Sequence, residues 1–370
     1  MARLGDVATY VNGFAFKPTD WADEGLPIIR IQDLTGNSYQ ANRYSGTYHP
    51  KYEVNEGDVL ISWSASLGVY VWHGEKAVLN QHIFKVVFDK AKVDKNFFVH
   101  QVQNILEKAA SEAHGATMKH LTKPVFDALP FYLPELEKQR EIAAVLDKVT
   151  ELIALRKEQL EKLDQLVKSR FIELFGDPVS NSKNLPELTL PELGEFGRGV
   201  SKHRPRNDPK LLGGKYPLIQ TGEVANSELY ITSYENTYSE LGLKQSKMWQ
   251  AGTLCITIAA NIAKTAILTF DACFPDSVVG FKANEKTNNI FIHYWFSFFQ
   301  AILEAQAPES AQKNINLKIL SELKIIVPPI EQQNEFAAFV EQTDKSKFAI
   351  QQSLNKLETL KKSLMQEYFG

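Results

Sequence analysis

Residues 131–176, FYLPELEKQREIAAVLDKVTELIALRKEQLEKLDQLVKSRFIELFG, recur in altered form as residues 325–370, IIVPPIEQQNEFAAFVEQTDKSKFAIQQSLNKLETLKKSLMQEYFG. The two segments lie 194 positions apart and are identical at 15 of 46 positions, far more than unrelated segments share. Similarity at one fixed spacing is the signature of an internal repeat. The chain is therefore built from two copies of one unit.

Upstream of these segments the two copies still correspond, but only as patterns. EGDVLISWSASLG (56–68) matches AGTLCITIAANIA (251–263), AVLNQHIFK (77–85) matches ACFPDSVVG (272–280), and LPIIRIQDL (26–34) matches YPLIQTGEV (216–224). The offset drifts between 190 and 195, which indicates small loop insertions on a common scaffold. We predict four regions: a first module at 1–133, a central helix at 134–176, a second module at 177–326 and a C-terminal helix at 327–370.

The repeated segments carry the signals of long helices. Pro134 suits a first helical turn, acidic residues follow it, and Gly176 ends the first segment before Asp177-Pro178. Apolar residues alternate at spacings of four and three, which is typical of a coiled-coil seam. The predicted seam residues are Ile142, Leu146, Val149, Ile153, Leu160, Leu163, Val167, Leu174, Val340, Ile350, Leu354, Leu357 and Leu364.

Each helix would span at least about 55 Å, longer than a module of this size, so pairing of the two helices is the most economical arrangement. The pair is antiparallel if a pseudo-two-fold axis relates the repeats. Thr343 and Lys347 occupy apolar slots in the second helix. We infer from them a weak middle of the seam, which contacts with other proteins would support.

Each module combines short strand-like runs with one amphipathic helix. Runs at 59–62, 82–88, 216–221 and 253–259 are rich in β-branched residues, and helices are expected at 97–113 and 290–307. The aromatic residues at 294–299 and Cys255 are assigned to the core. The predicted fold is α+β, with two mixed α/β modules in a pseudo-two-fold repeat separated by two long helices that form an antiparallel coiled coil.

Composition limits the possible functions. The net charge of -3 means that nucleic-acid binding would require basic residues gathered on one face. No apolar run approaches the roughly 20 residues of a membrane span. The N-terminus lacks the apolar core of a signal peptide. Two cysteines offer no disulfide framework, so we expect a cytoplasmic protein that contacts no membrane.

Basic and polar residues gather in a few loops. SKHRPRNDPKLLGGK (201–215) holds five basic residues and one acid, and the stretches near 62–64, 115–123, 257–264 and 310–318 are polar. Lys, Arg, Asn and Gln are the side chains that contact phosphates and base edges. The candidate DNA-binding residues are Lys17, Arg30, Ser62, Trp63, Ser64, Lys119, His120, Lys123, Lys202, His203, Arg204, Arg206, Lys210, Asn261, Lys264, Lys313 and Asn314.

Signals for catalysis are missing from the sequence. There is no Asn/Asp-Pro-Pro-aromatic motif for a flipped adenine and no Walker-type phosphate loop. The eight histidines show no paired metal-ligand spacing, so no metal site is expected. An enzyme is therefore disfavoured. A coiled-coil adaptor whose modules bind proteins stays open as the alternative, and a basic face shared by both modules would argue against it.

The helical segments resemble the conserved regions of specificity subunits of type I restriction-modification enzymes. The likeness rests on the helix-entry pattern P-x-x-E-x-Q, the seam and the closing FG in both copies, and on QKNINLKILSELKIIVPP (312–329). It implies a non-catalytic subunit that reads a bipartite, gapped DNA target, one half-site per module. It further implies two methyltransferase subunits and motor-endonuclease subunits as partners. No cofactor is expected on this chain, whereas S-adenosylmethionine, ATP and Mg²⁺ would act on those partners.

Overall fold

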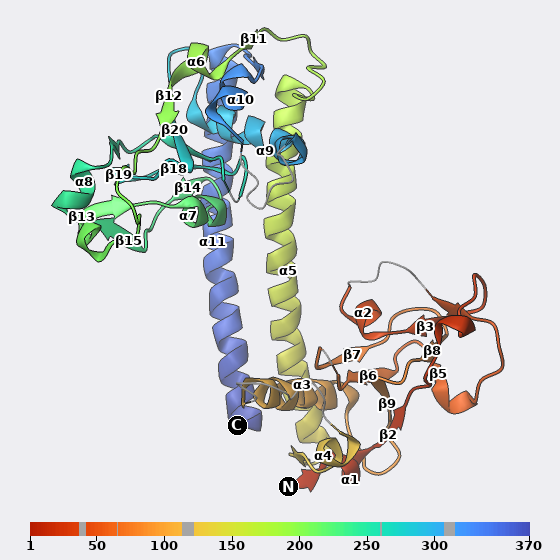
Figure 1. The fold of residues 1–370 in the computed structure, drawn as a ribbon. Coiled ribbons are helices and arrows are strands. Elements are labelled where there is room, and N and C mark those ends of the chain that lie inside the picture. The colour runs from red at the N-terminus through yellow and green to blue at the C-terminus, as the bar shows by residue number, and fades with distance from the viewer. Residues whose placement is uncertain (37–41, 65, 113–121, 260, 307–314) are drawn as a thin grey trace. The chain divides into compact units, whose positions relative to one another are not determined.

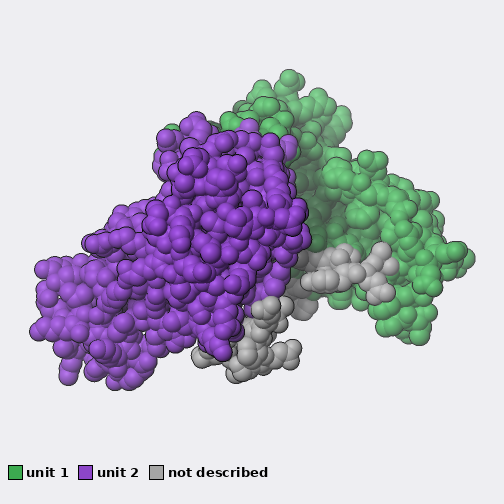
Figure 2. All heavy atoms as spheres, turned by 90° about the horizontal axis from the view of Figure 1, so that it is seen from above, with its two compact units in different colours: residues 1–158, 351–370 green, residues 159–350 purple. Residues whose placement is uncertain are grey.

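Two compact units make up the computed structural model of the chain. One unit contains residues 1–158 and 351–370, and the other contains residues 159–350 (Figure 2). The structure describes residues 1–36, 42–64, 66–112, 122–259, 261–306 and 315–370. Among the helices of these segments, none combines the length and apolarity needed to cross a bilayer.

The first unit contains two four-stranded sheets and a short ribbon. One sheet has the order β2-β9-β6-β7 and is antiparallel, the other has the order β4-β3-β8-β5, and β1 pairs with β10 (Figure 1). The strands are β1 (Ala2–Arg3), β2 (Thr9–Asn12), β3 (Leu26–Ile29), β4 (Arg43–Tyr44), β5 (Glu53–Val54), β6 (Val59–Ser62), β7 (Gly68–Val71), β8 (Ala77–Leu79), β9 (Ile83–Val87) and β10 (Pro130–Phe131). The helices are α1 (Leu4–Val7), η1 (Pro18–Asp20), α2 (Ile31–Leu34), η2 (Pro50–Tyr52), α3 (Lys95–Glu112) and α4 (Lys123–Asp127).

The second unit repeats this strand order. Its sheets have the orders β12-β20-β17-β18-β14 and β15-β13-β19-β16, and β11 pairs with β21. Its strands are β11 (Glu187–Leu188), β12 (Gly194–Arg198), β13 (Leu212–Leu218), β14 (Tyr230–Ile231), β15 (Asn236–Tyr238), β16 (Met248–Trp249), β17 (Leu254–Thr257), β18 (Thr265–Leu268), β19 (Ala272–Cys273), β20 (Val278–Ala283) and β21 (Ile325–Ile326). Its helices are α6 (Leu190–Leu193), η3 (Pro209–Leu211), α7 (Thr221–Asn226), α8 (Glu240–Lys244), α9 (Asn289–Gln306) and α10 (Leu317–Glu322). Each strand of the first unit has a counterpart here, and β14 is an addition.

Two long helices, α5 (Leu136–Phe175) and α11 (Ile330–Phe369), each contribute one half to each unit (Figure 1). In the second unit Asp164 pairs with Lys347 at 2.7 Å and Arg170 pairs with Glu335 at 2.7 Å. The residue number rises along α5 as it falls along α11, so the helices are antiparallel there. In the first unit Lys157 pairs with Glu358 at 3.3 Å.

Burial along the predicted seam is uneven. Ile142, Leu146, Val149 and Leu354 are buried in the first unit, and Val167 and Val340 are buried in the second. The remaining predicted seam residues are half-buried: Ile153, Leu160, Leu163, Leu174, Ile350, Leu357 and Leu364. The mixed α+β fold with a repeated module and long helices is confirmed.

The polar slots of α11 have partners within the second unit. Thr343 is buried, and its hydroxyl donates a hydrogen bond to the Phe339 carbonyl oxygen at 2.9 Å. The Lys347 side chain, only 12% exposed, forms ion pairs with Asp164 and with Glu228. The middle of the seam is therefore a polar network that connects α11 to the loop before β14.

Most predicted elements are found close to their expected limits. The strand at 59–62 is β6 without change, and the helices expected at 97–113 and 290–307 are α3 and α9. Trp295 and Phe296 are fully buried, and Cys255 is buried in β17, as predicted. These segments carry their signals locally, in β-branched runs or in apolar residues at helical spacing.

Two expectations at element boundaries were wrong. The strand expected at 216–221 is β13, which begins earlier, at Leu212, and ends at Leu218; the predicted loop 201–215 therefore ends in η3 and in this strand. Helix α7 follows at Thr221 because the Glu223 carboxylate accepts a hydrogen bond from the Gln220 backbone N–H at 3.1 Å.

Candidate nucleic-acid interface

Loops from several strands meet at one end of the first module. Strands β2, β3, β6 and β8 end there, and β9 begins there. Backbone N–H groups hold the ends together: Gly13 donates to Ile83 O at 3.2 Å, Phe14 to Leu79 O at 2.7 Å and Asn80 to Ile29 O at 3.1 Å. We call this region the strand-end surface of the first module.

The second module has the equivalent strand-end surface. Gly199 N–H donates to Val278 O at 2.8 Å, Ile219 N–H to Cys273 O at 2.9 Å and Ile258 N–H to Ser277 O at 3.0 Å. The loops that meet here begin at the ends of β12, β13, β17 and β19, the counterparts of the four strands above. The repeat therefore brings the same set of loops together twice.

Glycine is required where β2 and β12 end. A Cβ atom on Gly13 would lie 2.1 Å from the Asn80 carbonyl oxygen, and one on Gly199 would lie 2.2 Å from the Phe274 carbonyl oxygen. Real side chains never approach backbone so closely, so each glycine allows the first loop to pass directly over the turn before β9 or β20. These turns, residues 80–82 and 275–277, lie at the centre of the two surfaces.

In the first module, Lys17, Arg30 and Lys123 are at least partly exposed. Lys17 is exposed, and the Arg30 guanidinium lies 4.5 Å from the ring centroid of Trp21, which is 43% exposed. Lys123 begins α4, pairs with Asp127 at 2.7 Å and lies 5.9 Å from the Tyr10 ring centroid. All three cationic side chains therefore remain at the protein surface although they make these contacts.

The polar run Ser62-Trp63-Ser64 is mostly inside. Ser62 is fully buried and its hydroxyl donates to the Ser64 carbonyl oxygen at 3.1 Å, and Ser64 is 5% exposed. The half-buried Trp63 ring lies 5.6 Å from Phe84 and 5.5 Å from His82. These residues form the floor of the first strand-end surface. Lys119 and His120 lie outside the described residues.

The basic loop of the second module is exposed and firmly anchored. Lys202, His203, Arg204, Arg206 and Lys210 are all exposed. The Gln245 side-chain oxygen accepts hydrogen bonds from the backbone N–H groups of Lys202 at 2.7 Å and His203 at 3.0 Å.

Two aspartates complete the anchoring. Asp208 accepts from the Lys210 backbone N–H at 3.0 Å and pairs with the His203 ring, and these bonds lower the pKa of its carboxyl, the backbone bond most. Asp276, in the turn before β20, pairs with Arg206 and, at 3.5 Å, with Arg204. The charge of this loop is therefore partly balanced by an acid 70 residues away.

Asn261 and Lys264 lie on the loop between β17 and β18. Asn261 is exposed, and its carbonyl oxygen accepts a hydrogen bond from the Thr257 hydroxyl. Lys264 is half-buried, and its backbone N–H donates to the same hydroxyl at 3.1 Å. Thr257 thus shapes this loop from the end of β17. Lys313 and Asn314 lie outside the described residues.

Residues of the two central turns were not among the predicted DNA-binding residues. Gln81 and His82 are half-buried in the first turn, where Gln81 Nε2 lies 3.4 Å from His82 Nε2. Among the described residues, neither Gln81 Oε1 nor His82 Nδ1 has a hydrogen-bond partner. Asp276 stands at the position of Gln81 in the second module. A signal was present, because AVLNQHIFK and ACFPDSVVG differ most in the middle while their flanks correspond.

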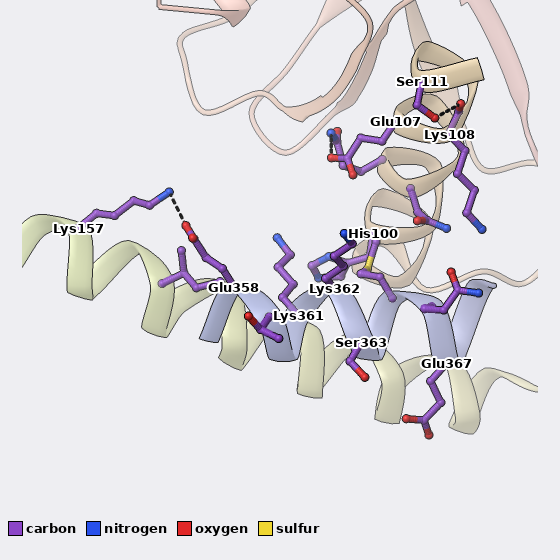
Figure 3. Close-up of a pocket in the computed structure, with 16 residues that line it drawn as sticks. His100, Glu107, Lys108, Ser111, Lys157, Glu358, Lys361, Lys362, Ser363 and Glu367 are labelled. Atoms are coloured by element: carbon purple, nitrogen blue, oxygen red, sulfur yellow. Dashed lines mark hydrogen bonds and ion pairs between the residues drawn. The ribbon is translucent and has the colours of Figure 1, made fainter. Parts of the chain in front are cut away.

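A groove lined by many polar and charged side chains lies in the first unit. It has a volume of about 1150 Å³ and lies between α3 and the ends of α5 and α11 that belong to this unit (Figure 3). Its lining includes His100, Asn104, Lys361 and Ser363, and Figure 3 shows the Lys361 side chain extending away from α11. His100 Nε2 lies 2.7 Å from Asp147 Oδ1, and burial lowers the pKa of this imidazole.

The equivalent place in the second unit is filled by aromatic rings. Tyr294 and Phe298 stand at the repeat positions of His100 and Asn104. Phe298 lies 5.1 Å from Phe171, and Tyr294 lies 5.3 Å from Phe336, between ring centroids. Polar and charged residues therefore line this helix contact in the first unit, whereas aromatic rings meet at it in the second unit. No group of three or more His, Cys, Asp or Glu among the described residues is arranged to hold a metal ion.

Comparison with known proteins identifies this doubled arrangement. Residues 1–165 and 187–361 each match the family described as "Type I restriction modification DNA specificity domain". The chain belongs to this family.

Relatives of similar length support the assignment for the whole chain. The specificity subunit of the type I restriction enzyme EcoBI of Escherichia coli is 25% identical, and the match covers 99% of this chain and 84% of that protein. The specificity subunit of MjaVIII from Methanocaldococcus jannaschii is 23% identical, with 99% and 90% covered. A crystal structure of the type I S subunit from M. genitalium shares the fold, with a TM-score of 0.58, 14% identity, and 100% and 95% coverage. The chain is thus a non-catalytic specificity subunit of a type I system, in which catalysis lies in partner subunits.

Proposed function

We propose that this specificity subunit reads a bipartite, gapped sequence in double-stranded DNA, with one half-site read by each module. The observation that carries the proposal is the repeated strand-end surface, built on equivalent strands but carrying different side chains. Gln81 and His82 occupy the central turn of one module, and Asp276 with its two arginines occupies that of the other. Equivalent scaffolds with unlike side chains suit an asymmetric target.

The exposed cations have the character that DNA contacts require. Lys17, Lys202 and Lys210 project from loops of these surfaces, where neutralising phosphates gives salt-dependent affinity. Arginine, glutamine and asparagine supply the paired donors and acceptors that distinguish base edges in the major groove. Linking the modules in one chain raises the effective concentration of the second half-site once the first is bound.

The long helices are proposed to recruit two methyltransferase subunits and the motor-endonuclease subunits. Large apolar side chains project from faces of α5 and α11 outside the seam: Leu155 and Leu360 in the first unit, and Leu166, Ile172 and Phe348 in the second. Phe348 is 66% exposed, and we assign these exposed side chains to contacts with the partner subunits. S-adenosylmethionine, ATP and Mg²⁺ would act on those partners. Both cysteines are buried free thiols, in keeping with the reducing cytoplasm where host DNA lies.

Methylation sequencing of host DNA, with the gene present and deleted, tests the proposal. Deletion is expected to abolish adenine methylation at one asymmetric, gapped motif, and restoring the gene is expected to restore it. A methylome unchanged by the deletion, while the methyltransferase subunit is shown to be produced, would instead support the coiled-coil adaptor.

A further inference from the structure

Asp276 makes an unusual set of contacts in the second strand-end surface. Its carboxylate pairs with Arg206 through Oδ1 and with Arg204 through Oδ2, the latter at 3.5 Å. Arg204 is also held by the backbone, since its Nη1 donates to Ser201 O at 2.6 Å and to His203 O at 2.9 Å. One half-buried acid therefore sets the position of two exposed guanidinium groups.

Among the described residues, only one nitrogen of the Arg206 guanidinium has a hydrogen-bond partner. Its Nη2 donates to Asp276, while Nε and Nη1 have no partner among the described residues, and the side chain is 46% exposed. A guanidinium carries five donors in a rigid planar fork. Each two-donor edge of a guanidinium includes Nη2, which carries two hydrogens. With one of them directed at Asp276, the other forms a pair of parallel donors with a neighbouring nitrogen, the geometry that matches O6 and N7 of guanine.

Asp276 is not needed to shape the loop. Gln245 already binds the loop backbone at Lys202 and His203, and Asp208 caps the turn that begins η3. The Asp276 carboxylate instead accepts a hydrogen bond from the Arg206 side chain and forms an ion pair with Arg204. In the first module Gln81 stands at the same position, so the turn itself does not demand an acid. Both observations indicate that Asp276 is not needed to shape the backbone of this loop or of the turn before β20.

We propose that Asp276 is a specificity-determining positioning residue that holds Arg206 so that its pair of parallel donors reads a guanine in the half-site of the second module. The inference rests on the proposed bipartite reading of DNA. Arg206 supplies the base contact, and Asp276 acts through it by restricting the rotamers of the arginine before DNA arrives. Preorganisation of this kind adds discrimination without any new contact.

The experiment uses the full specificity subunit assembled with its methyltransferase subunit. Target motifs are determined by methylation sequencing for wild type, D276N, D276E, R206K, R206A and the control E285Q, an exposed acid of the same module. D276N and R206K are expected to relax one guanine position by about tenfold to hundredfold and to leave the other half-site unchanged. D276E is expected to recover part of the selectivity, and E285Q is expected to retain all of it.

A change in the DNA provides a readout that does not depend on folding of a variant. Duplexes carrying 7-deazaguanine at the relaxed position lack the N7 acceptor. Wild type is expected to lose affinity for this duplex, whereas R206A is expected to bind both duplexes equally. Uniform weakening on all sequences in D276N and R206K, with a smaller salt dependence, would make Arg206 a phosphate contact and overturn the inference. If D276N has the same target motif as wild type, the inference is wrong but the proposed function stands. If wild type itself has no gapped motif, the proposed function is wrong as well.

Discussion

Gln139 and Gln333, at equivalent positions of the repeat, make the same buried contacts near the start of the two long helices. Each side chain is at most 1% exposed. Gln139 Nε2 donates to Pro134 O at 2.7 Å and to Lys92 O, and its Oε1 accepts from Asp94 N–H at 2.8 Å. Gln333 donates to Pro328 O at 2.8 Å and Lys286 O at 3.0 Å, and accepts from the Thr287 hydroxyl. Each glutamine thus joins a long helix to the turn before α3 or α9.

Replacing Gln333 with alanine is expected to lower the free energy of unfolding by about 1–3 kcal/mol, because buried backbone and hydroxyl groups lose their partners. Q139A is expected to behave alike. Urea denaturation followed by circular dichroism measures both. The control is Q332A, an exposed neighbour on the same helix, which is expected to change stability by less than about 0.5 kcal/mol. A Q333A protein as stable as Q332A would contradict the buried role.

Substitutions of Lys347 test how much the polar network in the middle of the seam contributes to stability. The repeat counterpart of Lys347 is Ile153, so K347I introduces the residue that the other copy already carries. The carboxylates left behind are largely exposed, with Asp164 57% and Glu228 77% exposed, so they stay hydrated. K347I is therefore expected to be as stable as wild type within about 1 kcal/mol, whereas K347A loses packing and is expected to be less stable. K345A, at an exposed site two residues away, is the control for thermal melting. A strongly destabilised K347I would show that the ion pairs dominate.

The environment of His293 predicts that the folded protein loses stability at acidic pH. His293 Nδ1 lies 2.9 Å from the Thr265 hydroxyl oxygen, and burial lowers the pKa of the imidazole to about 4. Above about pH 6.5 the ring is neutral in folded and unfolded chains and adds no pH dependence. As the pH falls from 6.5 toward 4, only the unfolded chain gains this proton, so up to about 3 kcal/mol of stability is lost.

H293N is expected to flatten this part of the stability–pH curve, because the asparagine oxygen can accept from Thr265 but does not titrate. Melting temperatures between pH 4 and pH 7 measure the slope. H73N, at an exposed histidine, is expected to leave the slope unchanged. Equal slopes for H293N and wild type would argue against a neutral imidazole in the folded chain.

Lys202 and Lys210 are expected to act through phosphates. The double variant K202A/K210A is expected to weaken binding of the assembled complex to all duplexes alike. If each lysine neutralises one phosphate, the slope of log K against log salt falls by about 1.8. Fluorescence anisotropy over a salt series measures this change. K286A, an exposed lysine elsewhere in the module, is the control, and an altered sequence preference in the double variant would contradict a phosphate role.

Long helices and central strands could be predicted from the sequence because their signals are local. The run at 59–62 lacks the alternation of apolar and polar residues that marks a half-buried strand, because every side chain of β6 is buried. Its β-branched residues nevertheless predicted this strand correctly. Helix α3 was expected at 97–113 and spans Lys95–Glu112. The start of α7 was missed because one capping carboxylate, Glu223, decides it.

The candidate interface was harder to predict, because charge balance depends on tertiary structure. The basic loop was counted with Asp208 as its only acid, and the fold adds Asp276, while Lys215 pairs with Glu240 at 3.5 Å. Likewise Ser62 belongs to a polar run in the sequence but is fully buried at the end of a central strand. Only the fold separates polar residues that face solvent from those that satisfy backbone groups.

Because α3 and α9 pack differently, only some recombination events between the two halves of such a gene would yield a stable subunit. A crossover between the duplicated coding segments that moved α9 without its helical partner would place Tyr294 and Phe298 in the groove that His100, Lys361 and Lys362 line. Apolar rings would then meet charged side chains, and the reciprocal product would bury His100 and Asn104 among Phe171 and Phe336. Viable crossovers are therefore expected upstream of α3 and α9, where they would exchange the loops proposed to read DNA and leave each module's helix with its own partner.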